Sequence, residues 1–232
     1  MVQAVVGRTI RNVTRIILTT LGPLQYFLDK PGLTHIYCLD DALTTLRNDG
    51  QKDLADRYRQ YHAEICHGLL WADRSWKNAS HYYRNPTEQT HALWPGALAE
   101  FQFYYQKYLV AAKREAARDR AKGMFYLGAA LHLIQDMCVP HHAVGSIFNG
   151  HQEFEKWARQ NYTSYPVTGA GMYLQLNHPS QWLDHNAGIA ATYYGLVSDG
   201  DTAGYALATQ ALIPLTIRAT AGFLAYAELD KD

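Results

Sequence analysis

The sequence predicts an all-α protein, and three observations support that prediction. Apolar residues recur at helical spacing along most of the 232-residue chain, as helices with one buried face require. The breaks between these segments carry Pro, Gly or Asn, and no run alternates polar and apolar residues as a half-buried strand would. The chain is 48% hydrophobic, enough for the core of one large domain. We expect a compact multi-helix domain over residues 31–232, preceded by a helical extension over residues 1–30.

The extension has an apolar face and a basic face. The first interpretation is an amphipathic helix over residues 2–21 that docks on the domain. The alternative is a helix whose basic face meets the anionic headgroups of a membrane. The apolar face consists of Val6, Ile10, Val13 and Ile17, and the basic face of Arg8, Arg11 and Arg15.

Three further helices are expected before residue 121. Pro31-Gly32 breaks the chain, Thr34 is positioned to cap the helix that follows, and Asn48-Asp49-Gly50 ends it. Residues 72–95 show no convincing period and predict an ordered loop, a kind of segment that is usually functional inside a compact domain. The predicted helices cover residues 35–47, 53–71 and 96–120.

The second half begins with the most apolar helix of the chain. Residues 121–138 are apolar on nearly every face, which predicts a buried central helix that Pro140 ends. Gly150 precedes the next helix, and Pro214 is expected to kink the last one. The predicted helices after Pro140 cover residues 151–160, 179–197 and 202–228.

Charge and cysteine content exclude several classes of protein. The 21 basic residues match the 21 acidic ones, so nucleic acid is not an expected partner. Cys38, Cys66 and Cys138 are far apart and form no CxxC pair, which argues against a disulfide framework and a thiolate zinc finger.

The sequence contains no clear targeting or membrane-spanning segment. No stretch approaches the roughly 20 apolar residues that cross a bilayer. Arg8, Arg11 and Arg15 interrupt the place where a signal peptide would have its apolar run. We therefore expect a cytoplasmic or membrane-peripheral location.

The predicted central helix contains a histidine and a carboxylate in an apolar setting. His132 and Asp136 are one helical turn apart and share a face. An internal hydrogen bond would explain this pair alone, because a buried carboxylate needs a partner. However, His151 and Glu155 repeat the spacing, with His142 in the connection between the two pairs. Imidazole and carboxylate groups are good zinc ligands, so the repetition favours a metal site.

At these residues the chain resembles the zinc-dependent phospholipase C family. Residues 125–143 are similar to the core signature of that family, and residues 151–155 to the helix that follows it. Ala72-Asp73 and residues 80–83 resemble its earlier metal-binding loop, with a shorter connection between them. Residues 34–37 resemble the segment with its first helical ligand, and residues 218–224 its closing helix.

The resemblance implies a set of zinc ligands. Two zinc ions are expected, and a third is conceivable. The implied ligands are Asp73, His81, His132 and Asp136 for one ion, His142, His151 and Glu155 for a second, and His35 with a bridging Asp136 for a third. In the family an N-terminal tryptophan completes this third site, but the first tryptophan here is Trp71. We therefore expect the third site to be weaker or to be completed differently.

The activity implied by the resemblance is that of a phospholipase C, which cleaves a phospholipid into diacylglycerol and a phosphorylated headgroup. Asp73 would act as a general base or hold the attacking water. Arg74 follows Asp73 where choline-hydrolysing relatives have an aromatic residue, so the headgroup is left open. His141 neighbours a ligand and has no counterpart of its own. The remaining histidines are interpreted as structural or solvated, and they are His62, His67, His91, His141, His178 and His185.

Two alternative functions stay open. The related single-strand nucleases and nucleotidases share the implied fold and zinc cluster. The short spacing from His142 to His151, and Glu155 as the last ligand, favour the phospholipase. The second alternative is a non-catalytic helical module that zinc stabilises and that docks on membranes. The sequence does not indicate an oligomeric state.

Overall fold

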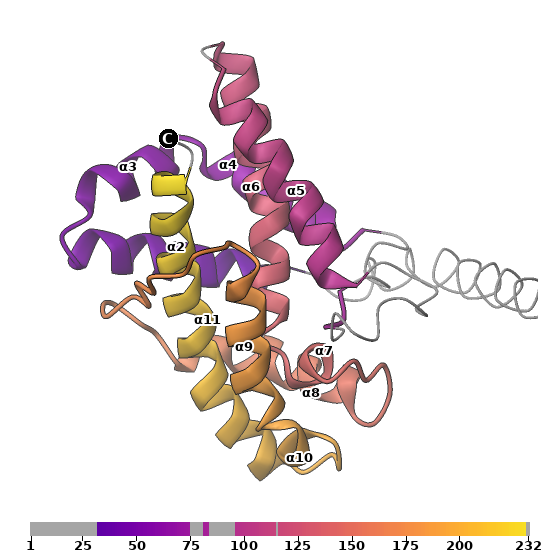
Figure 1. The fold of residues 1–232 in the computed structure, drawn as a ribbon. Helices are drawn as coiled ribbons and strands as arrows, with labels where there is room; N and C mark the ends of the chain where they lie inside the picture. The colour runs from indigo at the N-terminus through magenta and orange to yellow at the C-terminus, as the bar shows by residue number, and fades with distance from the viewer. Residues whose placement is uncertain (1–31, 75–80, 84–95, 115, 231–232) are drawn as a thin grey trace, which may run out of the picture.

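The computed structural model describes residues 32–74, 81–83, 96–114 and 116–230. The predicted extension over residues 1–30 and most of the predicted loop over residues 72–95 lie outside these ranges. Every regular element within them is helical (Figure 1), which confirms the all-α fold. The elements are α2 (Leu33–Asn48), α3 (Lys52–Gln60), α4 (His62–Ala72), α5 (Ala97–Ala112), α6 (Ala117–Asp136), α7 (Pro140–Ala143), α8 (His151–Asn161), η3 (Tyr162–Ser164), α9 (Gln181–Ala191), α10 (Tyr194–Val197) and α11 (Thr202–Asp230).

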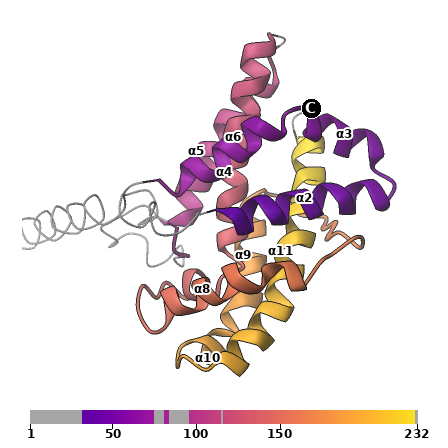
Figure 2. The same ribbon diagram turned by 180° about the vertical axis from the view of Figure 1, so that it is seen from behind.

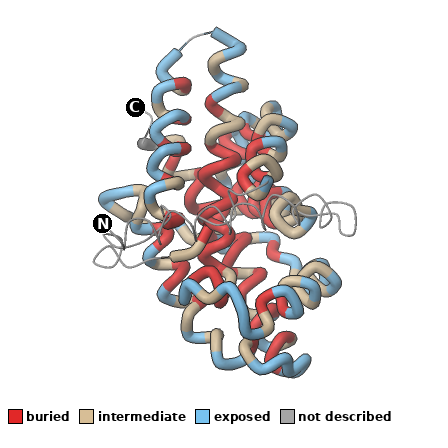
Figure 3. Tube along the Cα trace, turned by 90° about the vertical axis from the view of Figure 1, so that its right-hand side faces the viewer, coloured by how far each residue is buried: buried red, intermediate tan, exposed pale blue. Residues whose placement is uncertain are grey.

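Helix α6 forms the centre of the core. All residues from Leu127 to Asp136 are buried, as their uniformly apolar pattern predicts. Helices α4 and α5 pack along α6, and α9 and α11 also contact it. Seen from behind, α2 lies across α11 (Figure 2), and these two helices pack together. The buried residues concentrate where these helices meet (Figure 3).

A pair of glycines allows α4 and α6 to cross at very short range. A Cβ atom at Gly68 would lie 1.9 Å from the backbone oxygen of Phe125, and one at Gly128 would lie 2.1 Å from that of Ile65. No side chain fits at either position without a shift of backbone. The crossing therefore depends on glycine in both helices.

Three predicted helices are divided in the structure. The predicted helix over residues 53–71 breaks at Tyr61 into α3 and α4, and the one over residues 179–197 breaks at Thr192-Tyr193 into α9 and α10. The predicted helix over residues 96–120 ends at Ala112, and α6 begins at Ala117 rather than at residue 121. None of these breaks contains Pro or Gly. Tyr61, Thr192 and Tyr193 belong to the weaker helix formers, whereas the break at residues 113–116 interrupts residues of good helix propensity.

Two smaller features also differ from or extend the predictions. Thr34 does not cap α2, because it lies inside that helix and Gly32 occupies the cap position with φ 87°. Helix α11 continues through Pro214. By length and composition α11 could cross a membrane over Thr202–Glu228, but 72% of its most apolar window is buried inside the molecule, as in a core helix.

Candidate metal centre

The eight predicted ligands come from six parts of the chain, and these parts meet at the C-terminal end of α6. Two of these elements follow a glycine in the left-handed region, Gly32 with φ 87° before α2 and Gly150 with φ 82° before α8. Such turns favour glycine, and they place a histidine in the first turn of each helix. The ligands are His35 in α2, Asp73 directly after α4, His81 in the segment 81–83, His132 and Asp136 in α6, His142 in α7, and His151 and Glu155 in α8.

The first cluster surrounds one oxygen of Asp136. Its Oδ2 lies 2.9 Å from His81 Nδ1 and 3.1 Å from His132 Nε2, and these two nitrogens are 3.2 Å apart. Ligand atoms of Asp73, His81 and His132 also lie within 4.8 Å of one another. A tetrahedral zinc ion with bonds of about 2.0–2.1 Å separates its ligand atoms by roughly 3.3 Å. The spacing around Asp136 therefore fits zinc.

Hydrogen bonding also supports a cation at this cluster. Asp136 Oδ2 is buried and lies within ion-pair distance of two imidazoles, but among the described residues it accepts no well-aligned hydrogen bond. A buried charged oxygen without such a bond is costly. A cation between the carboxylate and the imidazoles removes that cost, because each ligand then directs a lone pair at the ion.

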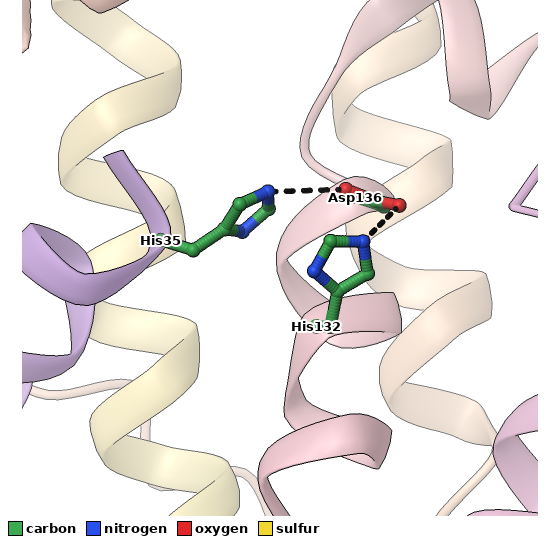
Figure 4. A group of neighbouring side chains, drawn as sticks. All are labelled: His35, His132 and Asp136. Carbon is green, nitrogen blue, oxygen red and sulfur yellow. Dashed lines mark ion pairs between the residues drawn. The ribbon is translucent and has the colours of Figure 1, made fainter. Parts of the chain in front are cut away.

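The second oxygen of Asp136 faces His35. Asp136 Oδ1 lies 3.6 Å from His35 Nε2, whereas Oδ2 faces His132 (Figure 4). The two carboxylate oxygens therefore face different histidines. His35 Nδ1 donates a hydrogen bond of 2.6 Å to Gln135 Oε1. Because Nδ1 carries the proton of the neutral ring, His35 Nε2 has a free lone pair that points toward Asp136. A metal ligand requires this tautomer. The geometry is suited to a carboxylate that bridges two ions.

The second cluster consists of His142, His151 and Glu155. Glu155 Oε1 lies 2.9 Å from His151 Nε2 and 3.4 Å from His142 Nε2. His142 Nδ1 donates to the backbone oxygen of His81 at 3.0 Å, so Nε2 is the nitrogen that would bind a metal after losing its proton. Buried His151 Nε2 has no hydrogen-bond partner among the described residues. This cluster also fits a cation.

The charges of the two clusters stabilise each other in the metal-free chain. Burial opposes ionisation of Asp136, but the positive charge of His132 and His142 outweighs it and holds the pKa of this carboxyl well below its usual value. Burial likewise opposes protonation of His142, but Asp136 and Glu155 raise its pKa to about 9. Burial and neighbouring His132 lower the pKa of His35. The carboxylate of Asp136 and the neutral imidazole of His35 are therefore ready to bind a metal.

Comparison with known proteins identifies the family to which this geometry belongs. The sequence model of the family described as "Zinc dependent phospholipase C" matches residues 34–198, which is more than half of the chain. The chain belongs to this zinc-dependent phospholipase C family. The predicted resemblance is thereby confirmed, and the family name implies zinc as the metal. The number of ions and the role of each ligand stay predictions.

Curated relatives and solved structures agree with this family. Two phospholipases C of Bacillus cereus are 24% and 25% identical over 184 residues, which cover 72% of this chain and 64% of each relative. The alpha toxin of Clostridium absonum matches with a TM-score of 0.71 at 17% identity, over 86% of this chain and 64% of the toxin. A Clostridium perfringens alpha-toxin from an avian strain matches with a TM-score of 0.67 at 16% identity, over 85% of this chain and 63% of the toxin. At these identities the structures show a shared fold, and this chain spans about two thirds of each relative's length.

The structure reveals two neighbours of the predicted ligands that sequence reasoning missed. Gln135 binds His35 as described above, and its Nε2 donates to Thr220 Oγ1 at 3.1 Å. The ring of Tyr82 stacks on His142 at 4.9 Å between centroids. The only sequence signal for either residue is its position next to a predicted ligand.

The remaining histidines have other surroundings. His141 is buried, and its Nε2 donates to the backbone oxygen of Asn149 at 2.8 Å. His62 pairs with exposed Asp40 at 2.7 Å. His91 lies outside the described residues. Within the described ranges, His62 and His141 belong to no candidate metal group, and neither do His67, His178 and His185.

Proposed function

We propose that this protein is a phospholipase C that hydrolyses the glycerol side of a phospholipid phosphate. The products would be diacylglycerol and a phosphorylated headgroup. The observation that carries the proposal is the arrangement around Asp136, where a buried carboxylate oxygen that accepts no well-aligned hydrogen bond from the described residues faces two imidazole nitrogens. This arrangement occurs in a chain of the zinc-dependent phospholipase C family.

The proposed zinc content follows from the two clusters. Asp73, His81, His132 and Asp136 would hold one ion, and His142, His151 and Glu155 a second. His35 and the other oxygen of Asp136 would hold a third ion more weakly, because these residues offer fewer ligand atoms. When bound, zinc supplies an activated water at neutral pH and positive charge for the phosphate oxygens.

The chain itself contributes orientation and proton transfer. Asp73 directly follows α4, is only partly buried and faces the cluster of His81 and His132. We infer that its carboxylate holds the attacking water and accepts its proton. Gln135 and the backbone oxygen of His81 fix two ligand imidazoles through their Nδ1 atoms, so that a substrate phosphate meets a preformed site.

The substrate headgroup and the membrane contact belong to the same proposal. Exposed Arg74 follows Asp73, which suits an anionic headgroup better than choline. The basic face predicted for residues 2–21 would attract the enzyme to anionic membranes. Equal vesicle binding by the wild type and an Arg8/Arg11/Arg15→Gln variant at low salt would refute this membrane role.

A phospholipid panel tests the activity. Purified protein is analysed for metals and incubated with vesicles of phosphatidylcholine, phosphatidylethanolamine, phosphatidylglycerol or phosphatidylinositol. We expect at least two zinc ions per chain and release of diacylglycerol, which a chelator abolishes and zinc restores. Single-stranded DNA and nucleotides serve as comparison substrates. Hydrolysis of these substrates alone would overturn the proposal in favour of a nuclease, and zinc without any hydrolysis would indicate a non-catalytic module.

A further inference from the structure

The connection between α7 and α8, here named the tip loop (residues 144–149), exposes large apolar side chains beside the candidate metal centre. The exposed fractions are 42% for Val144, 57% for Ile147 and 78% for Phe148. Phe148 is the most exposed large hydrophobic residue in the part of the chain that the structure describes. The loop begins two residues after His142 and ends two residues before His151. Figure 1 shows this connection projecting from the helical body.

Hydrogen bonds hold the tip loop in this position. His141 Nε2 donates to the backbone oxygen of Asn149 at 2.8 Å, and the amide of Ser146 donates to the backbone oxygen of His141 at 2.9 Å. The Tyr194 hydroxyl donates to Ser146 Oγ at 3.0 Å and accepts from Asn149 Nδ2 at 3.3 Å. The base of the loop is therefore fixed to buried His141 and to α10. Ile147 and Phe148 are held outward by the fold itself.

The chemistry of the tip loop selects its partner. The sequence from Val144 to Gly150 has no charged residue, so the loop offers nothing to a charged macromolecule. An apolar tip with Gly, Ser and Asn around it suits the boundary between the headgroups and acyl chains of a bilayer. The loop also connects two candidate zinc ligands, His142 and His151. The chain belongs to a phospholipase C family, and the phosphate of a bilayer phospholipid lies at this boundary.

We propose that the tip loop inserts Ile147 and Phe148 into the surface of a phospholipid bilayer and so places the metal centre over its substrate. This inference rests on the proposed phospholipase activity. The contact is apolar, so binding does not require anionic lipid or low salt. In this respect it differs from the basic contact predicted for residues 2–21.

Vesicle binding by Phe148→Ser tests the inference. Full burial of a phenylalanine side chain favours the apolar phase enough to change a partition constant about tenfold or more. We therefore expect the variant to bind neutral phosphatidylcholine vesicles about tenfold more weakly than the wild type, at low and at high salt. Phe103→Ser is the matched control, because Phe103 is 55% exposed on α5. The control should bind as the wild type does.

Two catalytic assays separate docking from chemistry. The Phe148→Ser variant should lose hydrolysis of vesicle lipid in proportion to binding, and should keep its zinc content and its turnover of a soluble chromogenic phosphodiester. Unchanged vesicle binding, or a joint loss of zinc and of soluble turnover, would overturn the inference. A wild-type dimer that Phe148→Ser converts to a monomer would assign the loop to a second copy instead. Phe148-dependent vesicle binding by a wild type without hydrolytic activity would support docking and refute the proposed function.

Discussion

Asp136 is the residue on which the candidate centre depends most. Its Oδ2 faces His81 and His132, while its Oδ1 faces His35 from the other side. A carboxylate at 4% exposure would be strongly destabilising without positive partners. We propose that this carboxylate binds two ions, one through each oxygen. Loss of its charge therefore weakens both sites together.

Asp136→Asn should accordingly cost more activity than any other single ligand substitution. The amide keeps the shape of the side chain and removes the charge. We expect a loss of at least one zinc ion and a fall in turnover of about 100-fold or more, since even indirect partners of a ligand contribute 10–100-fold. Elemental analysis and a chromogenic phosphodiester measure both effects, with Glu155→Gln as the comparison. Full zinc content with near-normal turnover would show that Asp136 does not bridge.

Gln135 should act as a positioning residue for His35. Gln135→Ala removes the acceptor of His35 Nδ1 and the link to Thr220. We expect the affinity for the most weakly held zinc ion to fall by about 10–100-fold, measured by competition with a chromophoric chelator. Gln135→Glu keeps an acceptor for His35 and should restore most of this affinity. Equal zinc affinity of the alanine variant and the wild type would contradict the role.

The candidate ligands that the structure brings together could be named from sequence, but their surroundings could not. His132 with Asp136 and His151 with Glu155 repeat one spacing on helices, and this local pattern survives folding. Gln135 meets His35 across 100 positions of sequence, a contact that only the packing of α2 against the core creates. No local pattern contains that information.

At the scale of elements, predicted boundaries were accurate where the chain itself marks them. Helix α8 begins at His151 after Gly150, and α6 ends at Asp136, shortly before Pro140. The prediction failed at Tyr61 and at residues 113–116, where the breaks have no Pro or Gly. The break at Tyr61 lets α3 pack on α2 while α4 packs on α6, and the break at residues 113–116 lets α5 pack back on α6. This tertiary gain exceeds the local propensity for helix.

The crossing of α4 and α6 gives a prediction with an internal control. Gly128→Ala places a methyl group 2.1 Å from the backbone oxygen of Ile65 and should destabilise the protein by about 1–3 kcal/mol. Gly188 in α9 has nothing within 4 Å of an added Cβ, so Gly188→Ala should stabilise by about 0.5–1 kcal/mol. Urea unfolding measures both free energies. Equal effects of the two substitutions would refute the close crossing.

The segment after η3 is fastened to the end of α2 by Asp49. Its carboxylate accepts the amides of Ala170 and Gly171 at 3.0 and 2.8 Å and the Tyr173 hydroxyl at 2.7 Å. Partial burial tends to raise the pKa of this carboxyl, but these donors outweigh burial and lower it. The resulting stability is present above the unfolded pKa of about 3.9. It is lost as the pH falls through the lower folded value.

Asp49→Asn should therefore be destabilising at neutral pH and less so in acid. Asparagine accepts weaker hydrogen bonds, and we expect a loss of about 1 kcal/mol at pH 7. The difference from the wild type should shrink as the pH falls below about 4, where the carboxyl of the unfolded chain becomes protonated, and further through the lower pKa of the folded carboxyl. Urea unfolding of both proteins at neutral and acid pH measures this trend. If the difference in unfolding free energy does not change with pH, the charged carboxylate of Asp49 is not the source of the stabilisation.

At the scale of the whole molecule, the candidate centre joins six parts of the chain at one end of the core. Its ligands lie in α2, α6, α7 and α8, in the short segment 81–83 and directly after α4. In the metal-free chain, imidazole–carboxylate pairs supplement hydrogen bonds between these parts at the end of α6, among them the one from the Tyr83 amide to the backbone oxygen of His142 at 2.8 Å. Bound zinc replaces those pairs with stronger bonds, so metal binding contributes directly to the free energy of folding.

Zinc removal should therefore lower the thermal midpoint of the whole protein. The stabilisation follows mass action, so each tenfold rise in free zinc above the dissociation constant adds about 1.4 kcal/mol for each ion bound only by the folded chain. We expect a chelator to lower the midpoint, added zinc to restore it, and magnesium to leave it low, because magnesium prefers oxygen ligands. Asp136→Asn should respond much less to zinc, since it lacks the shared ligand. A wild-type midpoint that does not change between chelator and excess zinc would mean that the ligands do not join these segments through an ion.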